Sequence, residues 1–341
     1  MLVSISTLLL IAVGGIAGAA AKADSWARDN RETPICQIAI RVADGARSRS
    51  WYQKMFSLEP IPAESPRWTA PVSVPQGAKM LGIPEFEIAG ASWVAGADSM
   101  SQLELFQISR PPPVALPADF GPRYAGYGVV GLVVADFEAM RDRTRAAGTQ
   151  YAITGTRPKR SMWMKDPDGV PLEIMERDPL GLHGAHQASA SIRSVTLTVS
   201  DLQKAKRFWT SAVGLSGESP GAYIFNAFPK ALGAGEWDQE VVKGGTVLIR
   251  LLRPRGSAVV PRSPDQKLSG VYHIAATLDD RTSWEALIQR VRALGYPLLS
   301  IESALLMGND AGAIYGHDDQ ENIVEFGFVL PGHEGKYGWR R

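Results

Sequence analysis

Apolar residues occupy every second position in four eight-residue segments of this chain, each ending on Asp: Gln37–Asp44, Val129–Asp136, Ser194–Asp201 and His273–Asp280. In the first segment, Ile38, Ile40 and Val42 fall on one side of the chain. Alternation with a period of two predicts a half-buried β-strand, and a helical stretch follows each segment. The chain therefore carries one strand–helix unit four times, which indicates a repeat architecture.

Features outside these segments repeat as well. An aromatic pair follows the first and the third segment at the same distance, and it predicts a helix packed on its own sheet: Trp51-Tyr52 and Phe208-Trp209. The second and fourth units continue into a helix that ends at Gly148 or Gly295, and then into a strand, a turn and a last strand. We expect four equivalent modules.

The length of the chain and its repeat together indicate two domains of two modules each. A chain of 341 residues is long enough for two domains with separate cores. We expect a signal peptide at residues 1–23, a first domain at 34–178, a linker at 179–190, a second domain at 191–331 and a polar tail at 332–341.

The N-terminal segment predicts export. Residues Met1–Ala21 carry no charged side chain, and Ala21-Lys22-Ala23 matches the cleavage pattern of a secretory signal peptide. We expect a periplasmic or secreted protein with no stable membrane span after the signal is removed.

Charge and cysteine content narrow the expected partners. The net charge of +1 gives no reason to expect a nucleic acid. One cysteine, Cys36, excludes an internal disulfide framework and a cysteine-based zinc cluster. We expect a small-molecule substrate or ligand, and a monomer or a homodimer.

The repeated segments, the aromatic pairs and the run Asp166–Glu173 carry a family resemblance. The chain resembles the vicinal oxygen chelate superfamily, which contains glyoxalase I, bleomycin-resistance proteins and extradiol dioxygenases. The resemblance implies an α+β fold of two domains, each built from two βαβββ modules that form a U-shaped mixed sheet.

Alternation also predicts which side chains reach the cavity of each domain. Because Ile38, Ile40 and Val42 are expected to face the helix, the residues between them should face the cavity. By this argument the first domain presents Gln37, Arg41, Glu104, Val129 and Glu173, and the second presents Ser194, Arg250, His273 and Glu325.

The resemblance implies a metal site in the first domain. Glyoxalase I relatives bind a divalent metal through His or Gln, Glu, His and Glu at the corresponding positions. The first domain keeps Gln37, Glu104 and Glu173, and has Val129 in place of the histidine. Three oxygen ligands suit Mg²⁺, Mn²⁺ or Ca²⁺ better than Zn²⁺, and Ni²⁺ and Fe(II) stay open. Glu104 and Glu173 are the expected catalytic groups, and two buried carboxylates require a cation, either the metal or a side chain such as Arg41. Arg41 is also an expected substrate-binding residue.

The second domain presents a weaker set of ligands. Extradiol dioxygenase relatives use His, His and Glu at the places held by Ser194, His273 and Glu325. Arg250 would repel a metal ion, and it is suited to pair with Glu325 or to bind an anionic substrate group. We expect either a weak metal site at His273 and Glu325 or a metal-free hydrogen-bonded cluster of these two residues with Arg250.

Two functions follow from these sets. One is a divalent-metal-assisted lyase, isomerase or dioxygenase that acts on a small oxygenated organic molecule, with a carboxylate moving a proton. The other is a metal-free small-molecule binding protein of the bleomycin-resistance type, in which both metal sites are degenerate.

Overall fold

The structure is a computed structural model that describes residues 33–61, 72–81, 83–96, 101–183, 189–223, 225–233, 235–298 and 305–333. The predicted signal peptide at residues 1–23 and most of the predicted tail lie outside the described residues. None of the described helices is long and apolar enough to span a membrane.

Four modules follow one another along the chain, as the repeat predicts. The first contains β1 (Ile35–Arg41), α1 (Gly45–Phe56), β2 (Glu59–Ile61), β3 (Val72–Ser73), α2 (Pro75–Leu81), β4 (Glu87–Ala95) and β5 (Gln102–Arg110). The second contains β6 (Gly126–Val133), α3 (Phe137–Ala146), β7 (Tyr151–Thr154), β8 (Ser161–Lys165) and β9 (Pro171–Met175).

The third module contains β10 (Ser191–Thr198), α4 (Leu202–Arg207), the π-helix η2 (Phe208–Val213), β11 (Ser216–Glu218), the short helices η3 (Pro220–Ala222) and η4 (Lys230–Leu232), β12 (Trp237–Gly244) and β13 (Val247–Pro254). After the short helix α5 (Pro264–Lys267), the fourth contains β14 (Gly270–Leu278), α6 (Arg281–Ala293), β15 (Leu305–Met307), β16 (Ala311–His317) and β17 (Ile323–Val329).

The aspartates that end the four alternating segments each cap a helix. Their carboxylates accept backbone N–H groups of the first turn of α1, α3, α4 and α6: Asp44, Asp136, Asp201 and Asp280. An N-cap satisfies donors that otherwise have no partner inside the helix, so the recurring Asp fixes where strand ends and helix begins.

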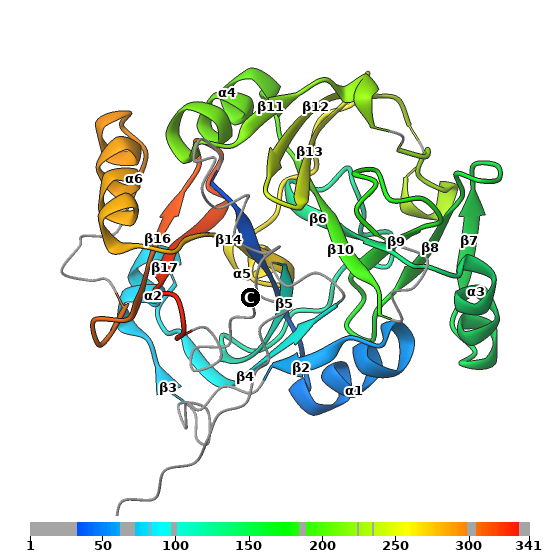
Figure 1. Cartoon of the computed structure of the whole chain (residues 1–341), viewed down its shortest axis with the longest axis horizontal. Helices are drawn as coiled ribbons and strands as arrows, with labels where there is room; N and C mark the ends of the chain where they lie inside the picture. The colour runs from blue at the N-terminus through cyan, green and yellow to red at the C-terminus, as the bar shows by residue number, and fades with distance from the viewer. Residues whose placement is uncertain are drawn as a thin grey trace, which may run out of the picture. The chain divides into compact units, whose positions relative to one another are not determined.

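The modules pair in an order that differs from the expectation. One sheet has the order β15-β16-β17-β14-β1-β5-β4-β2 and joins the first module to the fourth. The other has the order β11-β12-β13-β10-β6-β9-β8-β7 and joins the second to the third (Figure 1). We call the first sheet cup 1 and the second cup 2. The expectation that each cup is formed by consecutive modules is wrong, because β1 pairs with β14 and β6 pairs with β10.

The two faces of each sheet carry different cores. On one face, apolar side chains such as Ile38, Ile40 and Leu105 pack with the helices in one large cluster. The inner faces hold two smaller clusters, around Phe106 and Tyr272 in cup 1 and around Trp163 and Phe228 in cup 2. Consecutive residues of a strand therefore belong to different apolar clusters. A functional site is expected on the inner face.

Candidate metal site

Three potential metal ligands meet on the inner face of cup 1. Glu104 comes from β5, His273 from β14 and Glu325 from β17, and one ligand atom from each lies within 4.8 Å of the others. The His273 Nε2 atom is 3.5 Å from Glu104 Oε2 and 3.3 Å from Glu325 Oε2. All three side chains are buried.

Strand register explains why these residues meet. Ala39 on β1 pairs with Glu104 on one side and with His273 on the other. Ala275, two residues after His273, pairs with Glu325 and with Gln37. Gln37 is therefore related to His273 by the approximate twofold symmetry between β1 and β14, and Glu104 is related to Glu325 in the same way.

Two β-bulges adjust this arrangement. Cys36 is an extra residue in β1 before Gln37, and Tyr272 is an extra residue in β14 before His273. A bulge re-aims the side chains beside it, and bulges are frequent next to active sites. As a result the consecutive residues Tyr272 and His273 both lie on the inner face of cup 1, whereas Val271 before them and Ile274 after them pack with the outer core.

The charges in this cluster depend on one another. Burial alone would lower the pKa of His273, but the carboxylates of Glu104 and Glu325 outweigh it and raise that pKa to about 9. Burial, helped by the charge of Glu325, raises the pKa of Glu104 to about 7 against the opposing influence of His273. Two carboxylates share one imidazole, so the cluster is short of positive charge when both are ionised.

The donor set fits a divalent cation. Neither ring nitrogen of His273 nor Glu104 Oε2 has a hydrogen-bond partner of normal geometry among the described residues. Buried polar atoms without partners are rare in folded proteins and require an explanation. Metal–ligand distances of about 2.0–2.2 Å bring ligand atoms to within about 4.4 Å of each other, which agrees with the spacing seen here. One imidazole nitrogen and two carboxylates can bind such an ion, and Gln37 is placed to add an amide oxygen.

Aromatic side chains surround the imidazole. The rings of Tyr272 and Tyr315 approach His273 edge-on, with centroids 4.5 Å and 5.4 Å away. Tyr315 also pairs across the strands with Glu325, and Trp93 pairs with Glu104 in the same way. Alternation does not predict that Tyr272 and His273 share a face, because the bulge between them cannot be read from the sequence.

Arg41 lies on the same inner face, two residues beyond Ala39. Its Nη2 atom donates to the carbonyl oxygens of Ile108, at 3.0 Å, and of Pro111. Its Nε and Nη1 atoms are buried without a partner in the described chain. Burial lowers the pKa of Arg41, while nearby acidic groups oppose that effect.

Cup 2 places an arginine where cup 1 places a metal ligand. The register equates Ser194, Arg250, Val129 and Glu173 with the four inner positions of cup 1. Arg250 Nη1 lies 3.3 Å from Glu173 Oε2, and Ser161 Oγ donates to Glu173 Oε1 at 2.7 Å. The guanidinium supplies the positive charge that a buried carboxylate requires.

A segment of the third module fills cup 2. The Phe225 ring stacks on the Arg250 guanidinium at 3.9 Å, and Asn226 Nδ2 donates to Ser161 Oγ at 2.8 Å. Phe228 packs on Trp163 with centroids 5.2 Å apart. Val129, at the place of the missing histidine, belongs to the same apolar cluster. The interior of cup 2 is therefore occupied by the protein's own side chains.

The predicted grouping of site residues needs three corrections. Glu173 does not share a cavity with Gln37 and Glu104, because it lies in the other sheet. Arg250 pairs with Glu173, not with Glu325. His273 and Glu325 are joined by Glu104, so the full pattern of Gln, Glu, His and Glu is present in cup 1. The sequence predicts each of these positions on the inner face of a sheet, but it distributes them between the two cups incorrectly.

Comparison with known proteins agrees with this fold. The model of the Glyoxalase/Bleomycin resistance protein/Dioxygenase superfamily matches residues 35–174. No curated protein matches the sequence. A candidate dioxygenase from Bacillus subtilis has a similar structure, with a TM-score of 0.58, 16% identity, and coverage of 90% of this chain and 88% of that one.

Glyoxalase I from Zea mays is similar as well, with a TM-score of 0.57 and 14% identity over 87% of this chain and 92% of that one. At this level of identity, the two structures establish the fold and carry no information on the reaction. Four βαβββ modules, two mixed sheets and the sequence match agree with one another. Residues 35–174 therefore resemble the glyoxalase/bleomycin resistance protein/dioxygenase superfamily, and the described chain has the fold of these two solved structures.

Proposed function

We propose that this protein is a divalent-metal-dependent isomerase or lyase that acts on a small oxygenated organic molecule in cup 1. The observation that carries the proposal is the convergence of Glu104, His273 and Glu325 within 4.8 Å on the inner face of the sheet. Gln37 is the fourth expected ligand. Cup 2 takes no part, because Arg250 and the residues that cover it fill the equivalent place.

The donor set favours proton transfer over oxygen chemistry. Non-haem iron oxygenases use two histidines and one carboxylate. Cup 1 supplies one histidine and two carboxylates, with Gln37 where a second histidine would stand. Among the names of the structural neighbours, glyoxalase I fits this donor set better than dioxygenase does.

The bound ion would act as a Lewis acid toward substrate oxygens. Glu104 would take the proton from the carbon next to a carbonyl group, using a carboxylate oxygen that does not bind the ion. Returning that proton to the neighbouring carbon gives an isomerase, and loss of a leaving group gives a lyase. The aromatic rings around His273 would keep water from the reacting atoms.

Arg41 is the proposed substrate-binding residue. Its Nε and Nη1 atoms donate no hydrogen bond to any described protein group, and the side chain is buried. A guanidinium with two free donors binds a carboxylate or a similar planar anion well. We expect a substrate with an anionic group some distance from its reacting carbonyl.

The test is metal-dependent hydrogen exchange. The protein is stripped with EDTA and reconstituted with Mg²⁺, Mn²⁺, Co²⁺, Ni²⁺ or Zn²⁺, and dihydroxyacetone phosphate, which carries an anionic group, is followed by proton NMR in D₂O. We expect deuterium incorporation that requires the metal and falls by about 100-fold or more in Glu104→Gln. Absence of bound metal from every reconstituted sample would reject the proposal in favour of a metal-free binding protein.

A further inference from the structure

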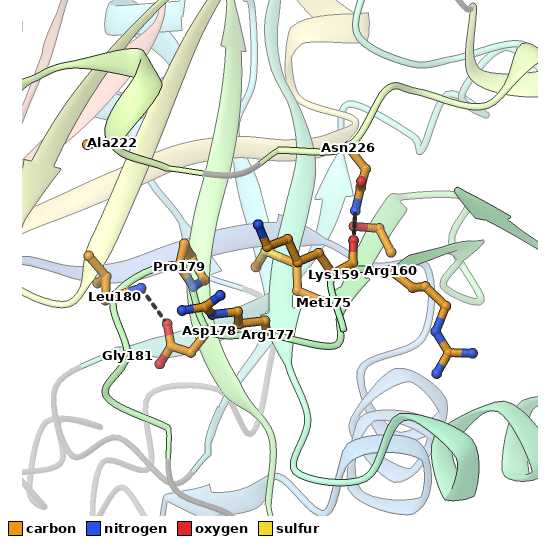
Figure 2. A pocket seen from close by; sticks show the side chains of 11 residues that line it. Lys159, Arg160, Met175, Arg177, Asp178, Pro179, Leu180, Gly181, Ala222 and Asn226 are labelled. Carbon is orange, nitrogen blue, oxygen red and sulfur yellow. Dashed lines mark hydrogen bonds between the residues drawn. The ribbon is translucent and has the colours of Figure 1, made fainter. Parts of the chain in front are cut away.

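A pocket unrelated to the candidate metal site lies at the edge of cup 2. Its volume is about 270 Å³, and Figure 2 shows the side chains that line it. It is bounded by the start of β8, the end of β9 with the loop after it, and residues of the third module: Lys159, Arg160, Ser161, Met175, Arg177, Asp178, Pro179, Leu180, Gly181, Ala222 and Asn226. None of these residues belongs to the candidate metal site.

Strand register brings two like charges together on one wall of this pocket. β8 and β9 are antiparallel, with Ser161 opposite Met175, and the Glu176 N–H donates to the Arg160 carbonyl at 2.9 Å beyond the last ladder pair. Continuing the register by one more residue places Lys159 opposite Arg177. Both pairs, Lys159 with Arg177 and Ser161 with Met175, line the pocket.

The neighbouring cross-strand pair is complementary. Arg160 Nη2 lies 2.6 Å from Glu176 Oε1, as expected for opposite charges facing each other across two strands. Like charges directly opposite are destabilising. In the described chain, neither Lys159 nor Arg177 forms an ion pair, and the pocket's one carboxylate, Asp178, is engaged by Arg193 Nε at 2.9 Å. The pocket therefore has two positive charges that no protein group balances.

We propose that this pocket binds the anionic group of a small molecule, a carboxylate or a phosphate, between Lys159 and Arg177. Such a group would relieve the repulsion between the two cations and form charge-assisted hydrogen bonds with both. Met175, Pro179 and Leu180 provide an apolar surface for the rest of the ligand. A volume just below the usual range of about 300–1,000 Å³ points to a ligand smaller than a typical cofactor.

The polar wall connects the pocket to the interior of cup 2. Asn226 Nδ2 donates to the Lys159 carbonyl at 2.7 Å and to Ser161 Oγ at 2.8 Å. Ser161 in turn donates to Glu173, the partner of Arg250. A chain of hydrogen bonds thus runs from the exposed Lys159 through the half-buried Asn226 to the buried Ser161 and Glu173, and none of these residues belongs to the candidate metal site in cup 1.

The test uses the full protein in EDTA, so that its outcome is independent of the proposed metal chemistry. Melting temperatures are measured in sodium phosphate, sodium hexanoate and sodium chloride at equal ionic strength. Lys159→Glu and Arg177→Gln remove one cation each. Arg49→Glu, at an exposed position of α1 without an ion pair in the described chain, makes the same charge change as Lys159→Glu and serves as the control.

We expect phosphate or hexanoate to raise the Tm of the wild type and of Arg49→Glu by roughly 2 °C more than it raises that of the two pocket variants. A response to phosphate alone identifies a phosphate group, and a response to hexanoate alone identifies a carboxylate with an apolar chain. The general stabilising effect of phosphate cancels in this comparison. An equal response of all four proteins, or no response to either anion, overturns the proposal.

Discussion

Individual buried acids outside the metal site make the stability of this fold depend on pH. Asp166, in the turn between β8 and β9, accepts a hydrogen bond from the Tyr52 hydroxyl at 2.9 Å and two from backbone N–H groups. Burial, with the nearby charge of Asp168, raises its pKa from 3.8 to about 7. The folded protein therefore holds a proton that the unfolded chain has released.

We predict that Asp166→Asn flattens the stability profile between pH 4 and pH 7. The pKa of Asp166 is higher in the folded protein than in the unfolded chain. Its contribution to the free energy of unfolding therefore decreases as the pH rises from about 4 to about 7. The amide keeps the acceptor for the backbone groups but cannot ionise. Urea unfolding at several pH values measures this, and a variant whose profile runs parallel to that of the wild type contradicts it.

The ion pair inside cup 2 is a second residue-scale feature. Arg250 and Glu173 have side chains that are 4% and 1% exposed. Burial lowers the pKa of Arg250 to about 10, and Glu173 opposes that shift. Removing one partner leaves the other charge buried and unpaired, whereas removing both does not.

We predict that Arg250→Met lowers the free energy of unfolding by about 3–5 kcal/mol, and that adding Glu173→Met recovers most of the loss. Guanidinium chloride titrations of the two variants and the wild type make the comparison. If the double variant is as unstable as Arg250→Met, then Arg250 does not stabilise the fold by balancing the charge of Glu173.

At the scale of elements, the segment between β11 and β12 determines that cup 2 is closed. Phe225, Asn226 and Phe228 reach from this segment to Arg250, Ser161 and Trp163. The inner face of cup 1 is also packed with apolar residues, but the polar groups that cluster there are Glu104, His273 and Glu325.

We predict that Phe228→Ala costs about 3–5 kcal/mol, because a large buried ring is deleted from a packed cluster. Trp163, the ring in contact with Phe228, should then shift its fluorescence emission to longer wavelength. Metal content should not change, since cup 1 is untouched. A decrease in the free energy of unfolding of less than about 1 kcal/mol would show that this segment does not pack tightly against the inner face of cup 2.

At the scale of the whole molecule, the sequence predicts the four modules and their fold but not their pairing. The alternating segments, the capping aspartates and the aromatic pairs are local features. Whether β1 pairs with β6 or with β14 cannot be decided from local sequence, because both strands carry a similar apolar pattern. For this reason the sequence predicts Gln37 and His273 in different cups, whereas the structure places both in cup 1. In the structure β1 pairs with β14, and β6 pairs with β10.

We predict that the chain from residue 33 to residue 183 does not fold as a monomer. Its two modules lie in different sheets, so β1 and β6 would each lose their central partner, β14 or β10. Circular dichroism and sedimentation of this fragment test the point, with co-expression of residues 189–333 as the rescue. A monomeric fragment with a cooperative unfolding transition would contradict the pairing.

The central claim is that the metal site of this protein is formed by the first and fourth modules. Metal content of reconstituted protein, measured by elemental analysis in His273→Ala and in Glu173→Gln, tests it most directly. We predict one divalent ion per chain in the wild type and in Glu173→Gln, and at least about 100-fold weaker binding in His273→Ala. Loss of metal in Glu173→Gln with retention in His273→Ala would contradict the account and favour a site formed by the first two modules.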